Sequence, residues 1–480
     1  SLKQGAGIEI QADSHSLLPL YSVNINEEDY ASSSFMALTK YLNSKTENPH
    51  FYKDLALFYA PLGSATYLKE IKRLQYGEKI VWHTELSIVN TKRFYDYFVE
   101  YPISVKESTA ILAENFIQNV QAYLQEPCAV VLTGGFDSRT LTACAHYYAT
   151  DFLSFSYGRK GNGDVENPLF LAKKLGLDYH WVELEEEYAR QQHYVSARES
   201  LLLSGGLSGF NSPHTLYGTK EMACYRPIHL VGYLGSEVFA AAKKGNDELI
   251  SQVVIDYIEN DENKLNYAYN IYETLQRLEI VNEQEDISKA LERLQSYIQT
   301  IPVKFSKNQI FSSFMFENVL RAVFGVFIKN GMQYAKIRVP FVDDDFFVRL
   351  SRTKLSSFYR QFLENNLYKR MDGQRLYPAI IKRTWKELNS LASSKGYAPS
   401  DIDNGIGIYK MILSKLLNIN PYKGKLIDNR SNIAGSIYYI QKETEINQDW
   451  KKLLENNLMI NALVYWALSK HEFKKIIWRK

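Results

Sequence analysis

The pattern of hydrophobic and polar residues changes its period at about residue 245. Before that point, short apolar runs typical of buried strands alternate with amphipathic stretches typical of helices. This alternation predicts an α/β fold with a doubly wound parallel sheet, whose ligands bind at the carboxyl ends of the strands. The expected strands cover residues 129–132, 151–156, 178–183 and 226–232, and the expected helices of this region cover 107–124, 139–148 and 167–175.

The regions on either side of the predicted sheet follow other patterns. Short runs before residue 105, such as 55–59, predict a small β-rich segment. After residue 245, apolar residues recur at i, i+3 and i+4, which predicts a largely helical region. Its expected helices cover residues 249–257, 267–278, 286–298, 315–330 and 450–469, and 470–480 is expected to be a solvated terminal helix. The predicted domains are therefore 1–105 and 106–480, the latter with an α/β core at 106–245 and a helical part at 246–480.

A glycine-rich loop, Thr133-Gly-Gly-Phe-Asp-Ser138, joins the first strand of the sheet to its helix. Glycines let the backbone approach a ligand, and the free N–H groups of a helix start attract anions, so the loop suits a phosphate. Asp137 would repel phosphate unless it holds Mg²⁺. A tight strand-to-helix turn with an Asp/Ser cap explains the same residues without a ligand, and the local sequence does not choose between the two. The lysine of a P-loop is missing.

Composition indicates which partners, metal sites and cell compartments to expect. The chain has 480 residues, 45% of them hydrophobic and 23% charged, with a net charge of +2, which is typical of a globular protein without a nucleic-acid partner. Its three cysteines have no CxxC spacing, so we expect neither a zinc site nor disulfides, and a reducing cytoplasm. We expect no membrane span, because no long uninterrupted apolar stretch occurs.

The loop resembles the pyrophosphate loop S-G-G-x-D-S of the ATP pyrophosphatases, with Thr133 in place of the first serine. Three later stretches, 155–176, 230–239 and 336–343, are similar in the same order to phrases of the asparagine synthetases. The last of them, Lys336-Ile-Arg-Val-Pro-Phe-Val-Asp343, resembles "EvRvPFlD" and separates this family from other enzymes with a pyrophosphate loop. The chain thus resembles the synthetase domain of asparagine synthetases, which implies the ATP-pyrophosphatase fold (adenine nucleotide α-hydrolase-like).

The resemblance implies that the chain uses ATP and Mg²⁺. The ATP-binding residues that it implies are Leu132, Thr133, Gly134, Gly135, Asp137, Ser138, Tyr157, Val231 and Gly232. Asp137 is the expected Mg²⁺ ligand. An ungapped match puts Ser236 at the second ligand position, but Glu237 is the better ligand for a hard cation, so we expect Glu237 there. Plain strand core would explain the side chains of Leu132, Tyr157 and Val231 as well.

Three further residues are catalytic candidates through the resemblance. Tyr233 matches a tyrosine of the β-lactam synthetase branch, which helps to deprotonate the attacking amine, although a packed aromatic explains it equally well. The family also uses a late lysine that stabilises charge during the reaction, and Lys395 or Lys386 would take this role. Arg338 and Asp343 are expected to be architectural.

Residues 69–78 are similar to a phrase from the glutaminase domain of asparagine synthetases, whose nucleophile is an N-terminal cysteine. Because no cysteine precedes Cys128, we interpret 1–105 as a degenerate or truncated glutaminase-like domain. The resemblance then implies an ATP-dependent ligase that adenylates a small-molecule or peptide carboxylate and joins it to an amine or to ammonia, which a separate amidotransferase could supply. The alternatives are a cyclase of the β-lactam synthetase or lasso-peptide type and a non-catalytic nucleotide-binding scaffold.

Overall fold

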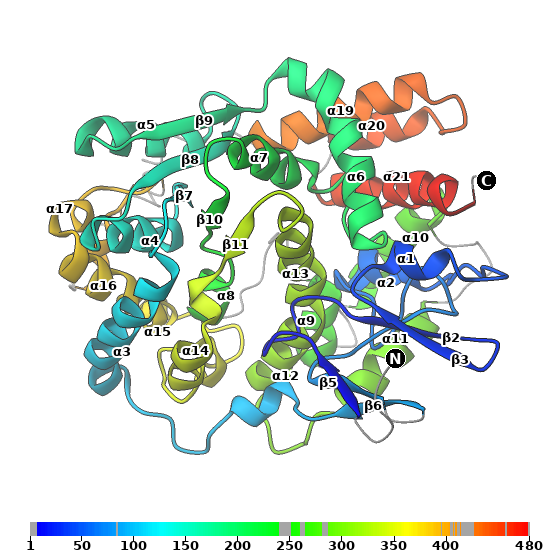
Figure 1. Cartoon of the computed structure of the whole chain (residues 1–480), viewed down its shortest axis with the longest axis horizontal. Coiled ribbons are helices and arrows are strands. Elements are labelled where there is room, and N and C mark those ends of the chain that lie inside the picture. The colour runs from blue at the N-terminus through cyan, green and yellow to red at the C-terminus, as the bar shows by residue number, and fades with distance from the viewer. Residues whose placement is uncertain are drawn as a thin grey trace.

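The computed structural model confirms the α/β fold (Figure 1). It describes residues 7–82, 85–239, 251–259, 265–280, 287–394, 396–403, 407, 409, 413, 427–456 and 458–478. Within them a parallel sheet has the strand order β11-β10-β7-β8-β9. Its strands are β7 (Cys128–Val131), β8 (Phe152–Gly158), β9 (Tyr179–Glu183), β10 (Ile228–Leu230) and β11 (Lys336–Arg338).

The order of the strands reverses at β7. From this strand the chain adds β8 and β9 on one side, and β10 and β11 on the other. Ligands of doubly wound sheets bind at the carboxyl ends of the strands at such a point of reversal, here between β7 and β10. The loop after β7 and the loop after β10 lie against each other at this place.

Helices α3 (Val105–Val120), α4 (Phe136–Tyr147) and α16 (Leu376–Thr384) pack together beside the sheet (Figure 1). Helix α5 (Gly163–Leu175) packs on β8, and α7 (Pro213–Ala223) contacts β8 and β9. Two predicted helix starts were too late. Helix α4 begins at Phe136 instead of 139. Helix α5 begins at Gly163 instead of 167, because the Asn162 side chain accepts a hydrogen bond from the Asp164 N–H and caps it.

After residue 245 the described part of the chain is largely helical, as predicted. Its elements include α9 (Gln252–Glu259), α10 (Leu265–Arg277), α11 (Ser288–Ile298), α12 (Lys307–Phe314), η5 (Met315–Val319), α13 (Leu320–Gly331), η6 (Pro340–Val342), α14 (Asp344–Ser351), α17 (Lys386–Asn389), α19 (Ile427–Lys442), α20 (Asp449–Asn456) and α21 (Leu458–Trp478). The predicted single helix over 450–469 is two helices, and the predicted solvated terminus belongs to α21. These residues are helical as expected, but Phe473 and Ile477 are buried, so one face of the helix packs inside the protein while Lys474 and Trp478 are exposed.

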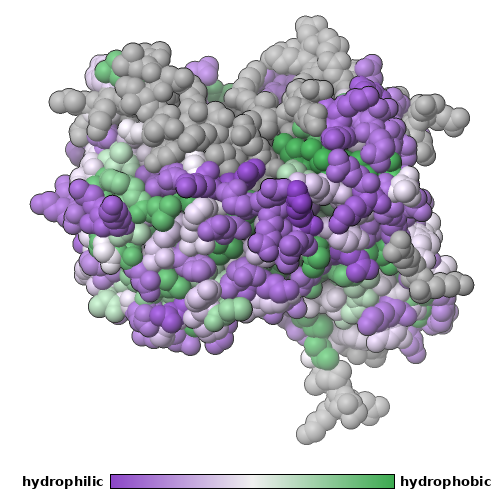
Figure 2. All heavy atoms as spheres, turned by 90° about the horizontal axis from the view of Figure 1, so that it is seen from above, coloured by the Kyte–Doolittle hydropathy of each residue, from purple (hydrophilic) through white to green (hydrophobic). Residues whose placement is uncertain are grey.

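Helices α12 and α13 and the π-turn between them form one continuous helix, Lys307–Gly331. Among the described residues it is the one helix whose length and composition would allow it to cross a membrane. However, 78% of its most apolar window is buried inside the protein, as in the core helix of a globular fold. On the face shown in Figure 2, apolar side chains form small separate areas among hydrophilic ones.

The N-terminal part contains two antiparallel sheets, ordered β1-β5-β6 and β3-β2-β4. The strands are β1 (Ile8–Gln11), β2 (Tyr21–Ile25), β3 (Glu28–Ser32), β4 (Lys72–Arg73), β5 (Glu78–Trp82) and β6 (Leu86–Asn90). The predicted strand at 55–59 was wrong, because these residues lie in helix α2 (Phe51–Phe58) and its cap. All eight residues of α2 are buried, and a helix buried on every side has the same continuous apolar run as a buried strand.

Buried charges join the N-terminal part to the helical part. The Arg93 guanidinium forms an ion pair with Glu317 at 2.8 Å, and Arg293 pairs with the buried Asp54. Arg321 donates to the backbone carbonyls of Ser16 and Leu74, each at 2.6 Å. Since apolar residues of both parts also belong to one core, the N-terminal sheets pack as an integral part of the protein. The domain boundary at 105 stays a prediction.

Candidate functional site

The loop after β7 is folded on itself by two hydroxyls. Ser138 Oγ accepts the Thr133 N–H at 3.0 Å and lies 3.1 Å from Thr133 Oγ1. Gly135 is the N-cap of α4, in an extended conformation, and a glycine has no side chain with which to cap the helix. Its own N–H donates to Thr133 Oγ1 at 3.3 Å. A helix whose N-cap offers no side-chain acceptor suits an anion at its start, so the local geometry favours the phosphate interpretation over the capped turn.

Three glycines of the two loops, Gly134, Gly232 and Gly235, lie too close to neighbouring atoms for a larger residue. A Cβ on Gly134 would clash with the Ser394 hydroxyl, and the Gly134 N–H donates to Asp164 Oδ1 at 2.8 Å. In the loop after β10, a Cβ on Gly232 would lie 3.0 Å from the Cβ of Asp137, and one on Gly235 would clash with Asp137 Oδ1. The second loop therefore lies directly against Asp137.

Asp137 contacts a residue that the sequence did not single out. Tyr377 on α16 is 3% exposed, and its hydroxyl donates to Asp137 Oδ1. Burial, followed by the negative charges of Asp137 and Glu237, raises the pKa of Tyr377 well above its ordinary value. Tyr377 therefore stays a donor at neutral pH, and both carboxylates lie near enough to act on its phenol.

Glu237 lies on the short helix α8 (Gly235–Phe239) and accepts the Ser236 hydroxyl at 2.9 Å. Ser236 is exposed, and its hydroxyl hydrogen-bonds the Glu237 carboxylate. Two carboxylates from neighbouring loops are the oxygen donors that Mg²⁺ prefers, so Asp137 and Glu237 fit the predicted metal pair. The assignment of these ligands stays a prediction.

The candidate adenosine contacts lie at the ends of the strands. Leu132 and Val231 are buried, and their N–H groups donate to Phe155 O at 2.7 Å and Arg338 O at 3.0 Å. Their side chains belong to the core, so any contact with a nucleotide falls to the rest of the backbone. Tyr157 is half-buried at the end of β8, where its ring lies 5.8 Å from the His214 ring.

The chain around Lys395 lies at the phosphate loop, although Lys395 itself is outside the described residues. On one side of it, the Ser394 N–H donates to Gly134 O at 3.4 Å. On the other side, Gly396 has a positive φ of 84° and its N–H donates to Ser393 O at 2.9 Å, which closes a turn. Lys386 is an exposed residue at the start of α17.

The family model of asparagine synthase matches residues 112–400, more than half of the chain. The chain belongs to the asparagine synthase family. This family uses ATP and Mg²⁺ and forms amide bonds, and its matched region contains both loops, Tyr377 and the segment next to Lys395. No curated protein sequence matches the chain.

Arg139 fixes the late segment of this asparagine synthase domain to the loop. Its guanidinium is fully buried and donates to the carbonyls of Leu391 and Ala392, both at 2.8 Å, and to Asn167 Oδ1. Burial lowers the pKa of Arg139 to about 9. The backbone carbonyls that accept its hydrogen bonds are neutral groups. Because Arg139 follows Ser138 directly, it connects the loop to the residues before Lys395.

Tyr233 is half-buried at the second loop, and its ring packs against the core. Its ring lies 5.3 Å from Phe324 and 6.1 Å from Phe327, both on α13. Burial raises the pKa of Tyr233 to about 12, despite a hydrogen bond with Tyr157. A base at neutral pH needs the opposite shift, so this geometry favours the packed aromatic over the base of the β-lactam synthetase branch.

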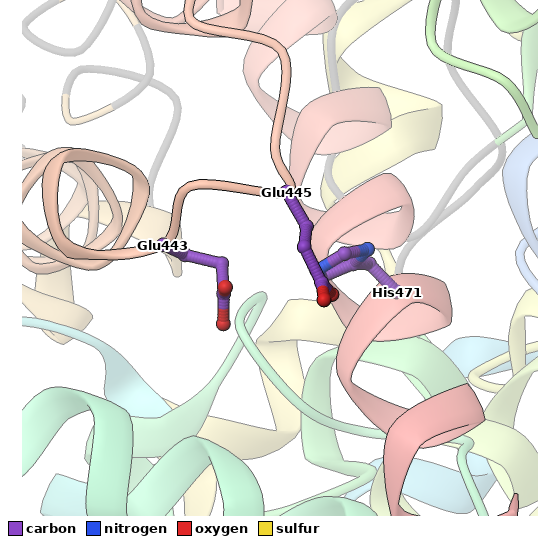
Figure 3. Close-up of side chains that lie close together, drawn as sticks. All are labelled: Glu443, Glu445 and His471. Carbon is purple, nitrogen blue, oxygen red and sulfur yellow. The ribbon is translucent and has the colours of Figure 1, made fainter.

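One cluster outside this site has the residue types of a metal centre. Ligand atoms of Glu443, Glu445 and His471 lie within 4.8 Å of one another (Figure 3). However, the Lys475 ammonium pairs with Glu443 and lies 3.4 Å from Glu445. A cation of the protein itself thus neutralises the carboxylates, and the cluster joins the turn after α19 to α21.

Sequence reasoning missed Tyr377 and Arg139. Tyr377 lies in an apolar helix, where a tyrosine is indistinguishable from other core residues. Arg139 carries a weak signal, since an arginine that follows the loop directly on a buried helix face needs a partner.

Proposed function

We propose that the protein is an ATP-dependent ligase that adenylates a substrate carboxylate and transfers the acyl group to ammonia or an amine. The observation that carries the proposal is the meeting of the Thr133–Ser138 loop, Asp137 and the Glu237 loop at the carboxyl ends of β7 and β10 in an asparagine synthase domain. Bound Mg²⁺ would neutralise phosphate charge, and Asp137 and Glu237 would hold it.

In the first reaction, a carboxylate oxygen attacks the α-phosphorus of ATP. The bond from this phosphorus to the oxygen that bridges to the β-phosphorus breaks, and pyrophosphate leaves. The uncapped start of α4 would stabilise the negative charge of the departing group. In the second reaction, the amine nitrogen attacks the acyl carbon, AMP leaves and the nitrogen loses a proton.

The products of turnover test this proposal. We expect any carboxylate that supports turnover to yield AMP and pyrophosphate in equal amounts, because the loop lacks the lysine that acts on β and γ phosphates in P-loops. Phosphorus NMR with ATP, Mg²⁺, ammonium and a panel of carboxylates that begins with aspartate measures this ratio. Accumulation of ADP would contradict the proposal, and tight Mg·ATP binding without turnover on a broad panel would favour the nucleotide-binding scaffold.

We further predict that the purified chain does not hydrolyse glutamine. The first cysteine, Cys128, is fully buried in β7, and burial raises the pKa of its thiol to about 11. Cys144 is also fully buried with a raised pKa. Because the nucleophile of amide hydrolysis in this family is an accessible thiolate, neither buried thiol can serve. The third cysteine, Cys224, is exposed at the end of α7, outside the part of the chain that resembles a glutaminase domain, and its thiol donates to the Lys220 carbonyl at 3.8 Å. Enzymatic detection of glutamate after incubation with glutamine measures the activity, and sustained release sensitive to a thiol reagent would refute the prediction.

A further inference from the structure

Tyr377 stands where three segments of the site meet. Its ring lies 6.0 Å from Phe136 at the start of α4, 5.2 Å from Phe239 on α8 and 6.4 Å from Phe341 in the Arg338-Val-Pro-Phe-Val-Asp343 motif. These rings surround the phenol, which is 3% exposed, and fix its orientation. The packed ring therefore holds the hydroxyl in a fixed position beside Asp137.

The two carboxylate oxygens of Asp137 face different surroundings. Oδ1 accepts the Tyr377 hydroxyl and lies against Gly235 of the second loop. Oδ2 lies on the side of the phosphate loop, where a Cβ on Gly135 would be 3.9 Å from it. A donor on one oxygen limits rotation of the carboxylate about its χ2 angle and leaves the other oxygen on the loop side.

We propose that Tyr377 is a positioning residue that holds Asp137 Oδ1, so that Oδ2 is presented to the metal beside the phosphate loop. This inference rests on the proposed function. It adds that α16, 240 residues further along the chain, determines how Asp137 binds the metal. Partners that hydrogen-bond a metal ligand typically affect metal affinity about 10- to 100-fold, which sets the expected size of the effect.

The test compares affinity for α,β-methylene-ATP, which cannot be split between its α and β phosphates, in excess Mg²⁺ and in EDTA. In Tyr377→Phe, calorimetry should show affinity in Mg²⁺ lowered about 10- to 100-fold with affinity in EDTA unchanged. Tyr123→Phe is the matched control, since Tyr123 also donates to a carboxylate, Asp343 Oδ2 at 2.9 Å, but away from the loops. This control should keep the wild-type ratio.

A double-mutant cycle separates a direct effect from a general one. In an Asp137→Asn background, Tyr377→Phe should cause no further loss, because the oxygen that it positions no longer carries the charge. Additive losses, or a Tyr377→Phe protein with unchanged or tighter Mg²⁺-dependent binding, would overturn the inference and leave the proposed function intact. A wild-type protein whose affinity does not respond to Mg²⁺ would overturn the proposed function itself.

Discussion

Replacing Asp137 with asparagine should abolish the Mg²⁺ dependence of ATP binding while the protein stays folded. Asparagine has the same shape and can still accept the Tyr377 hydroxyl, but it lacks the charge that a hard cation requires. Loss of a group that hydrogen-bonds a metal ligand typically lowers metal affinity about 10- to 100-fold. Loss of the ligand's own charge should therefore weaken Mg·ATP binding by about 100-fold or more. Calorimetry with Mg·α,β-methylene-ATP measures this change.

The matched control for this variant is Asp151→Asn. Asp151 is exposed, precedes β8 at its amino end and pairs with Arg226 at 2.9 Å. Asp151 lies at the amino ends of the parallel strands, whereas the two loops follow their carboxyl ends. Removing its charge should therefore leave nucleotide affinity unchanged. Both variants should unfold at temperatures close to that of the wild type. Equal Mg·ATP affinity in Asp137→Asn and wild type would remove Asp137 from the metal site.

Replacing Lys395 with alanine should slow amide formation by about 10²- to 10³-fold, which is the cost of losing one donor to an oxyanion in a catalytic site. The residues on either side of Lys395 belong to the site. Ser394 contacts Gly134, and Arg139 anchors the carbonyls of Leu391 and Ala392 to α4.

Lys386→Ala is the matched control for Lys395→Ala, because it removes the same side chain from an exposed position at the start of α17. We expect this variant to retain a rate close to that of the wild type. Steady-state rates of AMP release, measured with a carboxylate and amine that support turnover, compare the two variants. The reverse outcome, a large loss in Lys386→Ala alone, would transfer the catalytic role to Lys386.

Several elements could be predicted from the sequence because their signals are local. The strands β7, β8 and β9 are short apolar runs between turn residues, and Gly176 ends α5 with a φ of 67°. The loop after β7 could be predicted for the same reason, whereas the loop after β10 was found through the family resemblance. The errors also have local causes. The buried run of α2 was taken for a strand, and β11, only three residues long, has too few residues to show a period.

The sequence by itself determined the family, because four motifs occur in the order typical of asparagine synthetases. It also predicted the Thr133–Ser138 loop and Asp137 as a phosphate and metal site, because a strand, a glycine turn and a helix start follow one another within a dozen residues. Only the tertiary structure decided what surrounds Asp137. Tyr377 lies 240 residues away and the carbonyl of Leu391 lies 252 residues from Arg139, so no periodicity links these partners. They meet because α16 packs against α4, and that packing follows from burying apolar faces. Apolar burial is non-directional, so its pattern predicts that two helices are buried but not which polar groups come together.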